Sequence, residues 1–353
     1  MYFLSFVGPD YSRSSTLLNF KSSVIEKRFL QFSPGVIGII RTILKNKNEL
    51  SRANAIVVMS PCHLIAPLAK IFLKKKIILD AGWPLSDGNL SRGAHKRRPF
   101  HFLVVFLLDF ISFHVSDKIF LESQLQVIRC KKLFMLQENK LVVQYTGLNE
   151  SQFGTFKPKS QLINQLEFEI KTANKPLVVM FRGKVNSESG FGTILETAWL
   201  MSDVALFIFV VGPGQTDVTL PKNAVIFSDI TNADMEHLYD LADVSLGQIS
   251  NHKRLSYTIP HKAFEAAYFS QCYVTADSKG IRELFEENSV FYLSEISISK
   301  LLESLTTLMD KKARGRYSAE ISKVYSKKIS QTKINEVFDS TVMEILFSAR
   351  TLR

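Results

Sequence analysis

Residues 258–267 read Thr-Ile-Pro-His-Lys-Ala-Phe-Glu-Ala-Ala, and this stretch predicts a helix that begins beside a phosphate. Pro260 is a favourable first helical residue, because proline has no N–H to leave unpaired and its φ is preset. A helix that begins there directs free backbone N–H groups and the positive end of its dipole at whatever lies in front of it. Such a start suits a phosphate or diphosphate, with Pro260, His261 and Lys262 as the binding residues.

Two charged side chains strengthen this interpretation. Lys262 adds a cation in the first turn. Glu265 lies about one turn further on, on roughly the same face, where its carboxylate can accept hydrogen bonds from sugar hydroxyls. Phosphate site, cation and carboxylate at this spacing predict a nucleotide-sugar site. The alternative is an ordinary helix after a proline, with Lys262 and Glu265 on its solvated surface.

The pattern Pro-x-Lys-x-x-Glu is followed by an apolar strand at 272–275 and by a glycine turn that leads to Ile-Arg-Glu-Leu at 281–284. This succession resembles the donor-binding core of retaining glycosyltransferases with the GT-B fold, the family 4 group (glycosyl transferases group 1). In that family the Glu, here Glu265, holds the ribose of the nucleotide. Many members carry a second Glu eight residues upstream, near the donor sugar, where this chain has Tyr257.

A second cationic turn follows a predicted strand and reads Arg182-Gly183-Lys184. The GT-B family that this chain resembles has a Gly-Arg pair in this strand and a Lys-Gly pair a few residues later. In that family the two cations neutralise the donor diphosphate. Lys184 takes the place of the family's Arg, Ser189 stands where the second pair has Lys, and Arg182 is the neighbouring cation that compensates. Because a leaving diphosphate needs positive charge, we predict Lys184, Arg182 and Glu265 as catalytic residues and Gly183 as substrate-binding. Solvated loop cations are the alternative.

Glycine turns and polar residues after other strands complete the predicted site. Gly8 follows a buried-strand pattern at 2–7 and resembles, with one glycine only, the family's loop near the donor phosphates. Gly212 begins a Gly-Pro-Gly turn that is similar to a glycine turn of the family. Asp80 and His63 come at strand ends, and ligands of parallel sheets bind beyond the carboxyl ends of strands. A satisfied structural role for His63 and Asp80 stays open.

The alternation of short apolar runs with helical segments predicts an α/β chain with parallel sheets covered by helices on both faces. At 353 residues two domains are the natural expectation. The resemblance implies GT-B, with two Rossmann-like, doubly wound domains that face a central cleft. We predict an acceptor-binding domain at 1–160, joined by a C-terminal helix at 330–353, and a donor-binding domain at 174–325. The polar segment 154–174 is the predicted linker.

Charge and cysteine content limit the partners and the compartment. The net charge of +11 favours acidic partners, namely nucleotide phosphates, anionic lipid surfaces or nucleic acid. The basic residues are spread along the chain without an RNA-binding motif, which argues against nucleic acid. Three scattered cysteines without metal spacing indicate reduced thiols in a cytoplasmic protein. The apolar start lacks a basic region before it, so we expect a first strand rather than a signal peptide.

One segment suggests a membrane surface. Lys96-Arg97-Arg98 precede a mostly apolar run at 99–113 that is shorter than a bilayer span and is interrupted by Asp109. Two interpretations stay open. The run is either a buried core helix or a helix whose aromatic edge and basic flank enter an anionic membrane surface, with Lys74-Lys75-Lys76 adding to the patch.

The resemblance, taken with these patterns, implies a retaining glycosyltransferase of hexosyl or N-acetylhexosaminyl type that acts in surface polysaccharide biosynthesis. It would move a sugar from a nucleotide-diphosphate sugar to a glycan acceptor that is lipid-linked, at the inner face of the plasma membrane. We expect no metal and no cofactor, since no zinc pattern, Walker loop or Asp-x-Asp pair is present. Two alternatives stay open: a nucleotide-sugar 2-epimerase of the same fold, and a catalytically degenerate GT-B module that acts in binding.

Overall fold

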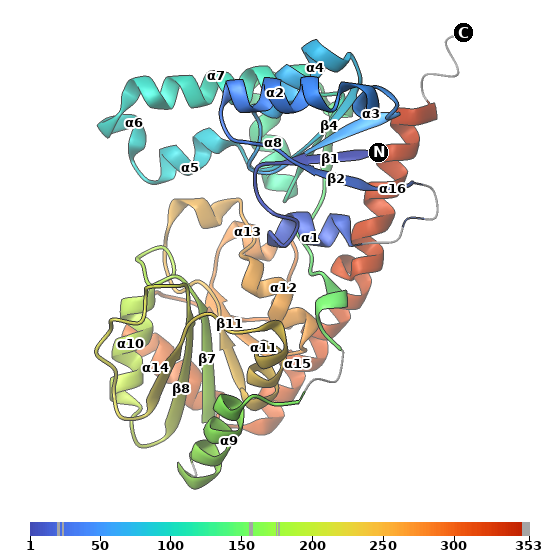
Figure 1. Ribbon diagram of the computed structural model, residues 1–353. Coiled ribbons are helices and arrows are strands. Elements are labelled where there is room, and N and C mark those ends of the chain that lie inside the picture. Colours follow the sequence, from blue (N-terminus) through green and yellow to red (C-terminus); the bar gives the residue numbers. More distant parts are fainter. Residues whose placement is uncertain (20–21, 23–24, 155–157, 174, 176, 348–353) are drawn as a thin grey trace. The chain divides into compact units, whose positions relative to one another are not determined.

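The computed structural model describes the chain except residues 20–21, 23–24, 155–157, 174, 176 and 348–353 (Figure 1). The chain divides into two compact units, Met1–Asn149 with Gln331–Arg353 (unit 1) and Glu150–Ser330 (unit 2). Each unit contains one six-stranded sheet in which all recorded strand pairs are parallel. The predicted α/β class with two doubly wound parallel sheets is therefore confirmed.

The sheet of unit 1 has the strand order β2-β1-β3-β4-β5-β6. Its central strands β3 and β4 are rich in buried apolar residues, because helices cover both faces of the sheet and leave no solvated side. In β3 all five residues are buried. The strands are β1 Tyr2–Ser5, β2 Arg28–Gln31, β3 Ala55–Met59, β4 Lys76–Gly82, β5 Lys118–Leu121 and β6 Leu141–Val143.

Two groups of helices cover the sheet of unit 1. One face packs against α2 (Val36–Lys45), α4 (Ile65–Leu73), α7 (Pro99–Val115) and α8 (Gln124–Leu133). The other face packs against α1 (Ser12–Leu18) and the C-terminal α16 (Gln331–Phe347), whose Phe338 stacks on Phe3 with ring centres 5.8 Å apart. The C-terminal helix thus lies on the sheet of the first unit, as predicted. The short helices of this unit are α3 Lys47–Ser51, α5 Leu85–Ser91 and α6 Ala94–Arg97.

The sheet of unit 2 has the strand order β12-β11-β10-β7-β8-β9. Strand β8 shows why this sheet is central to the unit, since all seven of its apolar residues are buried. Three phenylalanines, at 181, 207 and 209, are among the largest fully buried side chains. The strands are β7 Leu177–Gly183, β8 Ala205–Val211, β9 Ala224–Phe227, β10 Val244–Leu246, β11 Cys272–Ala276 and β12 Phe291–Leu293.

Helices cover both faces of this second sheet as well. One face packs against α9 (Gln161–Ala173) and α11 (Asn232–Leu241), through Ile163, Leu166, Leu238 and Tyr239 among others. The other face packs against α10 (Phe191–Leu200), α14 (Ile298–Thr307) and α15 (Lys311–Val324). The remaining helices of the unit are α12 His261–Tyr268 and α13 Lys279–Arg282.

Several predicted boundaries differ from the observed ones. The chain passes from unit 1 to unit 2 at Asn149 and returns after Ser330, so unit 2 is longer at both ends than the predicted second domain, 174–325. Segment 154–174 is no open linker, because α9 occupies most of it and buries Ile163 and Leu166; residues 155–157 and 174 lie outside the described residues.

Candidate functional site

The candidate site of unit 2 lies at one edge of its sheet, where three neighbouring strands end in glycine turns. Gly183 ends β7 opposite Val211 of β8, and Gly212 comes next in the chain. Gly247 follows β10, whose last residue pairs with Phe181 of β7. Because these strands are parallel, all three glycines lie at their carboxyl edge, where ligands of such sheets bind. The structure therefore brings together two of the predicted glycines, Gly183 and Gly212.

Helix α12 begins at this edge. Its first helical residue is His261, and Pro260 is the N-cap with extended φ and ψ of −60° and 137°. The prediction of Pro260 as the first helical residue is thus wrong by one position. The reason is local: the Pro260 carbonyl accepts the first turn's hydrogen bond from the Ala263 N–H at 2.9 Å, while its own ψ stays outside the helical range.

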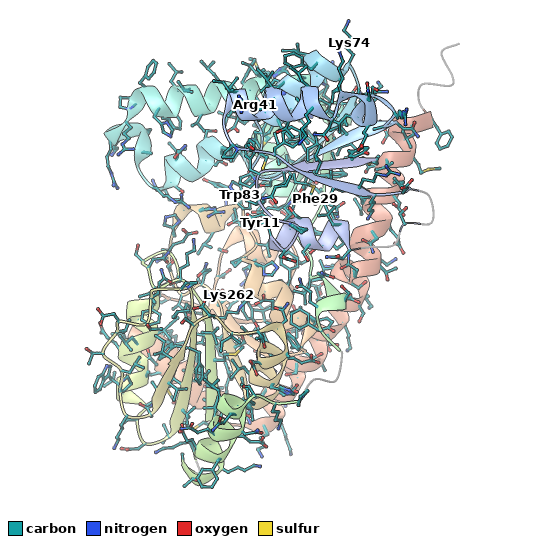
Figure 2. The ribbon with its side chains drawn as sticks, viewed as in Figure 1. Tyr11, Phe29, Arg41, Lys74, Trp83 and Lys262 are labelled. Atoms are coloured by element: carbon teal, nitrogen blue, oxygen red, sulfur yellow. The ribbon has the colours of Figure 1, made fainter. Side chains whose placement is uncertain are left out.

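Lys262, labelled in Figure 2, is buried rather than solvated. Its ammonium donates a hydrogen bond to the Gly247 carbonyl at 3.2 Å and lies 4.1 Å from the ring centre of Phe181. A Cβ at Gly183 would lie 3.0 Å from the Lys262 Nζ, so glycine leaves the ammonium its place. Burial, and second the nearby Arg182, lower the pKa of Lys262 to about 7.

Glu265 is held inside the unit by three partners. Its Oε1 forms ion pairs with the Arg182 guanidinium and with His261 Nδ1, the latter at 3.2 Å. Its Oε2 accepts a hydrogen bond from the Tyr239 hydroxyl at 3.1 Å. The side chain is only 3% exposed. The carboxylate therefore ties α12 to β7 and α11, and it does not lie on an open face beside Lys262 as the helical spacing suggested.

His261 presents an unpaired nitrogen at the same place. Burial, and second the charge of Arg182, lower its pKa to about 3, so the ring is neutral. With Nδ1 donating to Glu265, Nε2 is left as a hydrogen-bond acceptor. Nε2 is buried and finds no partner among the described residues, although 29% of the side chain is exposed. A hydrogen-bond donor, such as a hydroxyl group, would satisfy this nitrogen.

The loop after β7 uses Ser189, which stands where the GT-B family 4 group has a lysine, for its own packing. Ser189 is buried, and its hydroxyl donates to the backbone carbonyls of Lys184 and Asn186 at 2.7 and 2.8 Å. The next residue, Gly190, has a φ of +73°, and a Cβ there would lie 1.8 Å from the Ile249 carbonyl oxygen. The position thus serves loop packing. The side chain of Lys184 is exposed at the start of the loop, and the side chain of Arg182 is 36% exposed.

The candidates of unit 1 have structural partners. Asp80 is fully buried and forms an ion pair with Arg13 at 2.6 Å. Burial raises the pKa of Asp80 even though Arg13 opposes the shift. His63 is also fully buried, with Nδ1 2.7 Å from Asp109 Oδ1. Each of the two side chains therefore has a structural partner at one polar atom. The other atoms, Asp80 Oδ2 and His63 Nε2, lack partners among the described residues.

Gly8 lies in the loop after β1, and no atom stands within 4 Å of a Cβ built on it. Among the described residues, steric contact therefore does not require glycine at this position. Within the described part of the chain, no group of three or more His, Cys, Asp or Glu residues is placed to hold a metal ion.

Two residues of the site were missed by the sequence reasoning. Tyr239, which donates to Glu265, is one polar residue in the helical run 232–241 and gives no signal of its own. Gly247 follows a short apolar strand, and that position is the available signal, because glycines after parallel strands line ligand sites. A Cβ at Gly247 would meet the Tyr273 hydroxyl at 2.5 Å.

No protein-family model and no curated protein sequence matches this chain. Its structure, however, is similar over almost its whole length to solved structures. One is HepE (Alr3699) of Anabaena in complex with UDP-glucose, with a TM-score of 0.72 and 13% sequence identity, covering 98% of this chain and all of HepE. The fold is GT-B. This confirms the predicted fold, while membership of family 4 stays a prediction.

Two further GT-B chains show the same likeness. A glycosyltransferase from Rickettsia africae has a TM-score of 0.68 and 12% identity, over 98% of each chain. A protein of Listeria monocytogenes assigned as a UDP-N-acetylglucosamine 2-epimerase has a TM-score of 0.57 and 10% identity, over 98% of this chain and 97% of the other. At such identities the likeness shows the fold alone, and activity has to be argued from the residues.

Proposed function

We propose that this chain is a retaining glycosyltransferase whose unit 2 binds a nucleotide-diphosphate sugar and whose unit 1 binds the acceptor. The observation that carries the proposal is the cationic site at the carboxyl edge of β7 and β10. There Lys262 and Arg182 lie beside the start of α12, at the edge where the glycine turns after β7, β8 and β10 meet. Backbone N–H groups and cations beside small residues commonly form diphosphate-binding sites.

Each side chain has a role in this proposal. A bound diphosphate stabilises the charged form of Lys262, and Lys262 and Arg182, with Lys184 from the loop, stabilise the departing diphosphate. Glu265 fixes Arg182 and, through it, orients the nucleotide. The unpaired Nε2 of His261 accepts a hydrogen bond from a hydroxyl of the donor. The leaving phosphate takes the acceptor proton, so neither a metal nor a cofactor is called for.

The proposal also names the chemical class of the donor and of the acceptor. HepE, which shares the fold, holds UDP-glucose in its structure, and this favours a UDP-sugar of hexosyl or N-acetylhexosaminyl type as the donor. The net charge of +11 favours a lipid-linked glycan acceptor in surface polysaccharide assembly, reached from the cytoplasmic side of the membrane.

Two other functions have one observation each in their favour. The likeness to the Listeria protein favours a nucleotide-sugar 2-epimerase. The replacement of two family residues by Ser189 and Tyr257 favours a GT-B module that binds and does not catalyse. Both alternatives keep the fold, and they differ from a transferase in the products formed from the donor sugar.

Thermal unfolding with a panel of UDP, GDP, ADP, CMP and their sugars tests the donor site. A ligand at about 100 times its Kd stabilises the folded state by about 2.7 kcal/mol, which corresponds to roughly 5–10 °C for a unit of this size. We expect one diphosphate nucleotide to give such a shift with the wild type and with Glu303→Ala, an exposed control in the same unit. The shift should be lost in Glu265→Ala and in Lys262→Met.

The second variant guards against misfolding, because methionine keeps the apolar stem of Lys262 and removes only the charge. No shift with any nucleotide, in a well-folded wild type, would contradict the donor site and favour the binding module. Analysis of the sugar products then separates the enzymes: a new glycosidic bond or released donor sugar supports the transferase, and a sugar inverted at C2 supports the epimerase.

A further inference from the structure

The outer side of one helical layer of unit 1 is apolar. Helices α2, α4 and α7 pack their inner sides on the sheet through residues such as Ile39, Ala69 and Phe113. Their outer sides carry large apolar residues that are 48–78% exposed. We call this set the apolar face; it consists of Val36, Ile37, Leu44, Ile71, Phe100, Leu103, Val104, Leu107 and Ile111.

Helix α7 contributes most of the apolar face. Its exposed residues at 100, 103, 104, 107 and 111 recur every three or four positions and therefore form one stripe along the helix. Asp109, Ser112 and Phe113 are buried in the same helix. A surface helix normally carries polar residues on its solvent side, so an exposed apolar stripe indicates a surface that is covered in use. The interpretation of α7 as a buried core helix is thus wrong for this side.

The exposed charges on the helices that carry the apolar face are positive. Helices α2, α4, α6 and α7 contain a single acidic residue, Asp109, which is buried and bonded to His63. Exposed cations come from α2, from the turn after α4 and from the segment before α7. They include Arg41 and Lys74, labelled in Figure 2, and Lys45, Lys96, Arg97 and Arg98. A partner with negative charge and an apolar interior complements this surface.

We infer that the apolar face docks on an anionic lipid bilayer, with the stripe of α7 entering the headgroup region and the cations at 96–98 contacting lipid phosphates. The combination of an apolar stripe with a cationic flank is the pattern of helices that lie in a membrane interface. None of the helices in the described residues has the length and apolar run needed to cross a bilayer, so the contact is peripheral. The inference stands independently of the donor site, which lies in unit 2.

Sedimentation of the whole chain with vesicles tests this inference. We expect binding to vesicles that contain phosphatidylglycerol, little binding to pure phosphatidylcholine, and weaker binding as salt rises. Loss of three cations in Lys96→Gln/Arg97→Gln/Arg98→Gln should weaken binding about fivefold per residue, or roughly a hundredfold together. The double change Leu103→Gln/Leu107→Gln should also weaken it. The matched control is Trp199→Gln/Leu200→Gln, which changes two exposed apolar residues of α10 in unit 2.

Four outcomes would overturn the inference. The first is a folded wild type that stays in solution with anionic vesicles. The second is equal binding to neutral and anionic vesicles, and the third is an equal loss in the α10 control. The fourth is a monomer–dimer equilibrium without vesicles that disappears in Leu103→Gln/Leu107→Gln, because the apolar face would then join two copies of the chain.

Discussion

Binding of the sugar donor should depend on pH through Lys262. In the free protein, burial and Arg182 hold the pKa of this ammonium at about 7, so about half of the molecules carry the charge at neutral pH. A diphosphate beside Nζ favours the charged form and raises the pKa on binding. Binding therefore takes up a proton above neutral pH, and the affinity falls as pH rises. His261 does not contribute, because its pKa of about 3 keeps it neutral throughout this range.

The size of the effect follows from this pKa. If donor binding raises the pKa of Lys262 from about 7 to about 10, the dissociation constant increases about 25-fold between about pH 6.5 and about pH 8.5. This is a loss of about 2 kcal/mol of binding free energy. At about pH 8, roughly 0.9 proton is taken up for each donor molecule bound.

Titration calorimetry in two buffers of different ionisation enthalpy measures both quantities. The ligand should be the intact nucleotide-diphosphate sugar, since its diphosphate diester does not titrate in this range. Lys262→Met should bind more weakly at low pH, with an affinity that no longer changes with pH. A wild-type affinity that is constant over the range, with the same enthalpy in both buffers, would show that Lys262 is not the group that meets the diphosphate.

Three further predictions concern stability. Gly190→Ala should destabilise unit 2 by several kcal/mol, measured by chemical denaturation, because its Cβ would lie 1.8 Å from the Ile249 carbonyl oxygen; a change within error would refute the packing argument. Arg13→Met should cost about 3–5 kcal/mol by leaving Asp80 buried without its cation, and the loss should shrink as pH falls and Asp80 takes up a proton; a pH-independent loss would contradict this cause. Ser123→Ala should cost about 1 kcal/mol in thermal unfolding, since its hydroxyl caps α8, whereas Ser123→Thr should retain most of that stability.

The sequence by itself determined the architecture and the location of the candidate site. Runs such as 205–211 are apolar throughout, and only a strand covered on both faces tolerates this, which predicts parallel sheets between helices. The ends of parallel strands lie at one edge, so Gly183, Gly212 and the start of α12 had to come close together. Turn glycines and the proline before α12 depend only on the neighbouring residues, so they can be recognised from the sequence without knowledge of the fold.

Only the tertiary structure decided the electrostatic state of the candidate residues. The sequence left open whether Lys262 and Glu265 contact a ligand or lie on a solvated helix surface, because helical spacing reports faces and not what packs against them. Their burial follows from Phe181 on β7, from Gly247 directly after β10 and from Tyr239 on α11, which are all distant from them in the chain. Desolvation depends on such non-local neighbours, so a pKa of about 7 cannot be read from a motif.

The same reason separates the two interpretations of α7. A helix that is apolar all round has one hydropathy pattern whether its second side is buried by protein or left exposed. The sequence therefore left both a core helix and a membrane-surface helix open. Packing of α4 and α5 beside α7 covers one side and leaves the stripe from Phe100 to Ile111 in solvent. What covers a side chain is a property of the assembled unit, and this is the information that a single sequence does not hold.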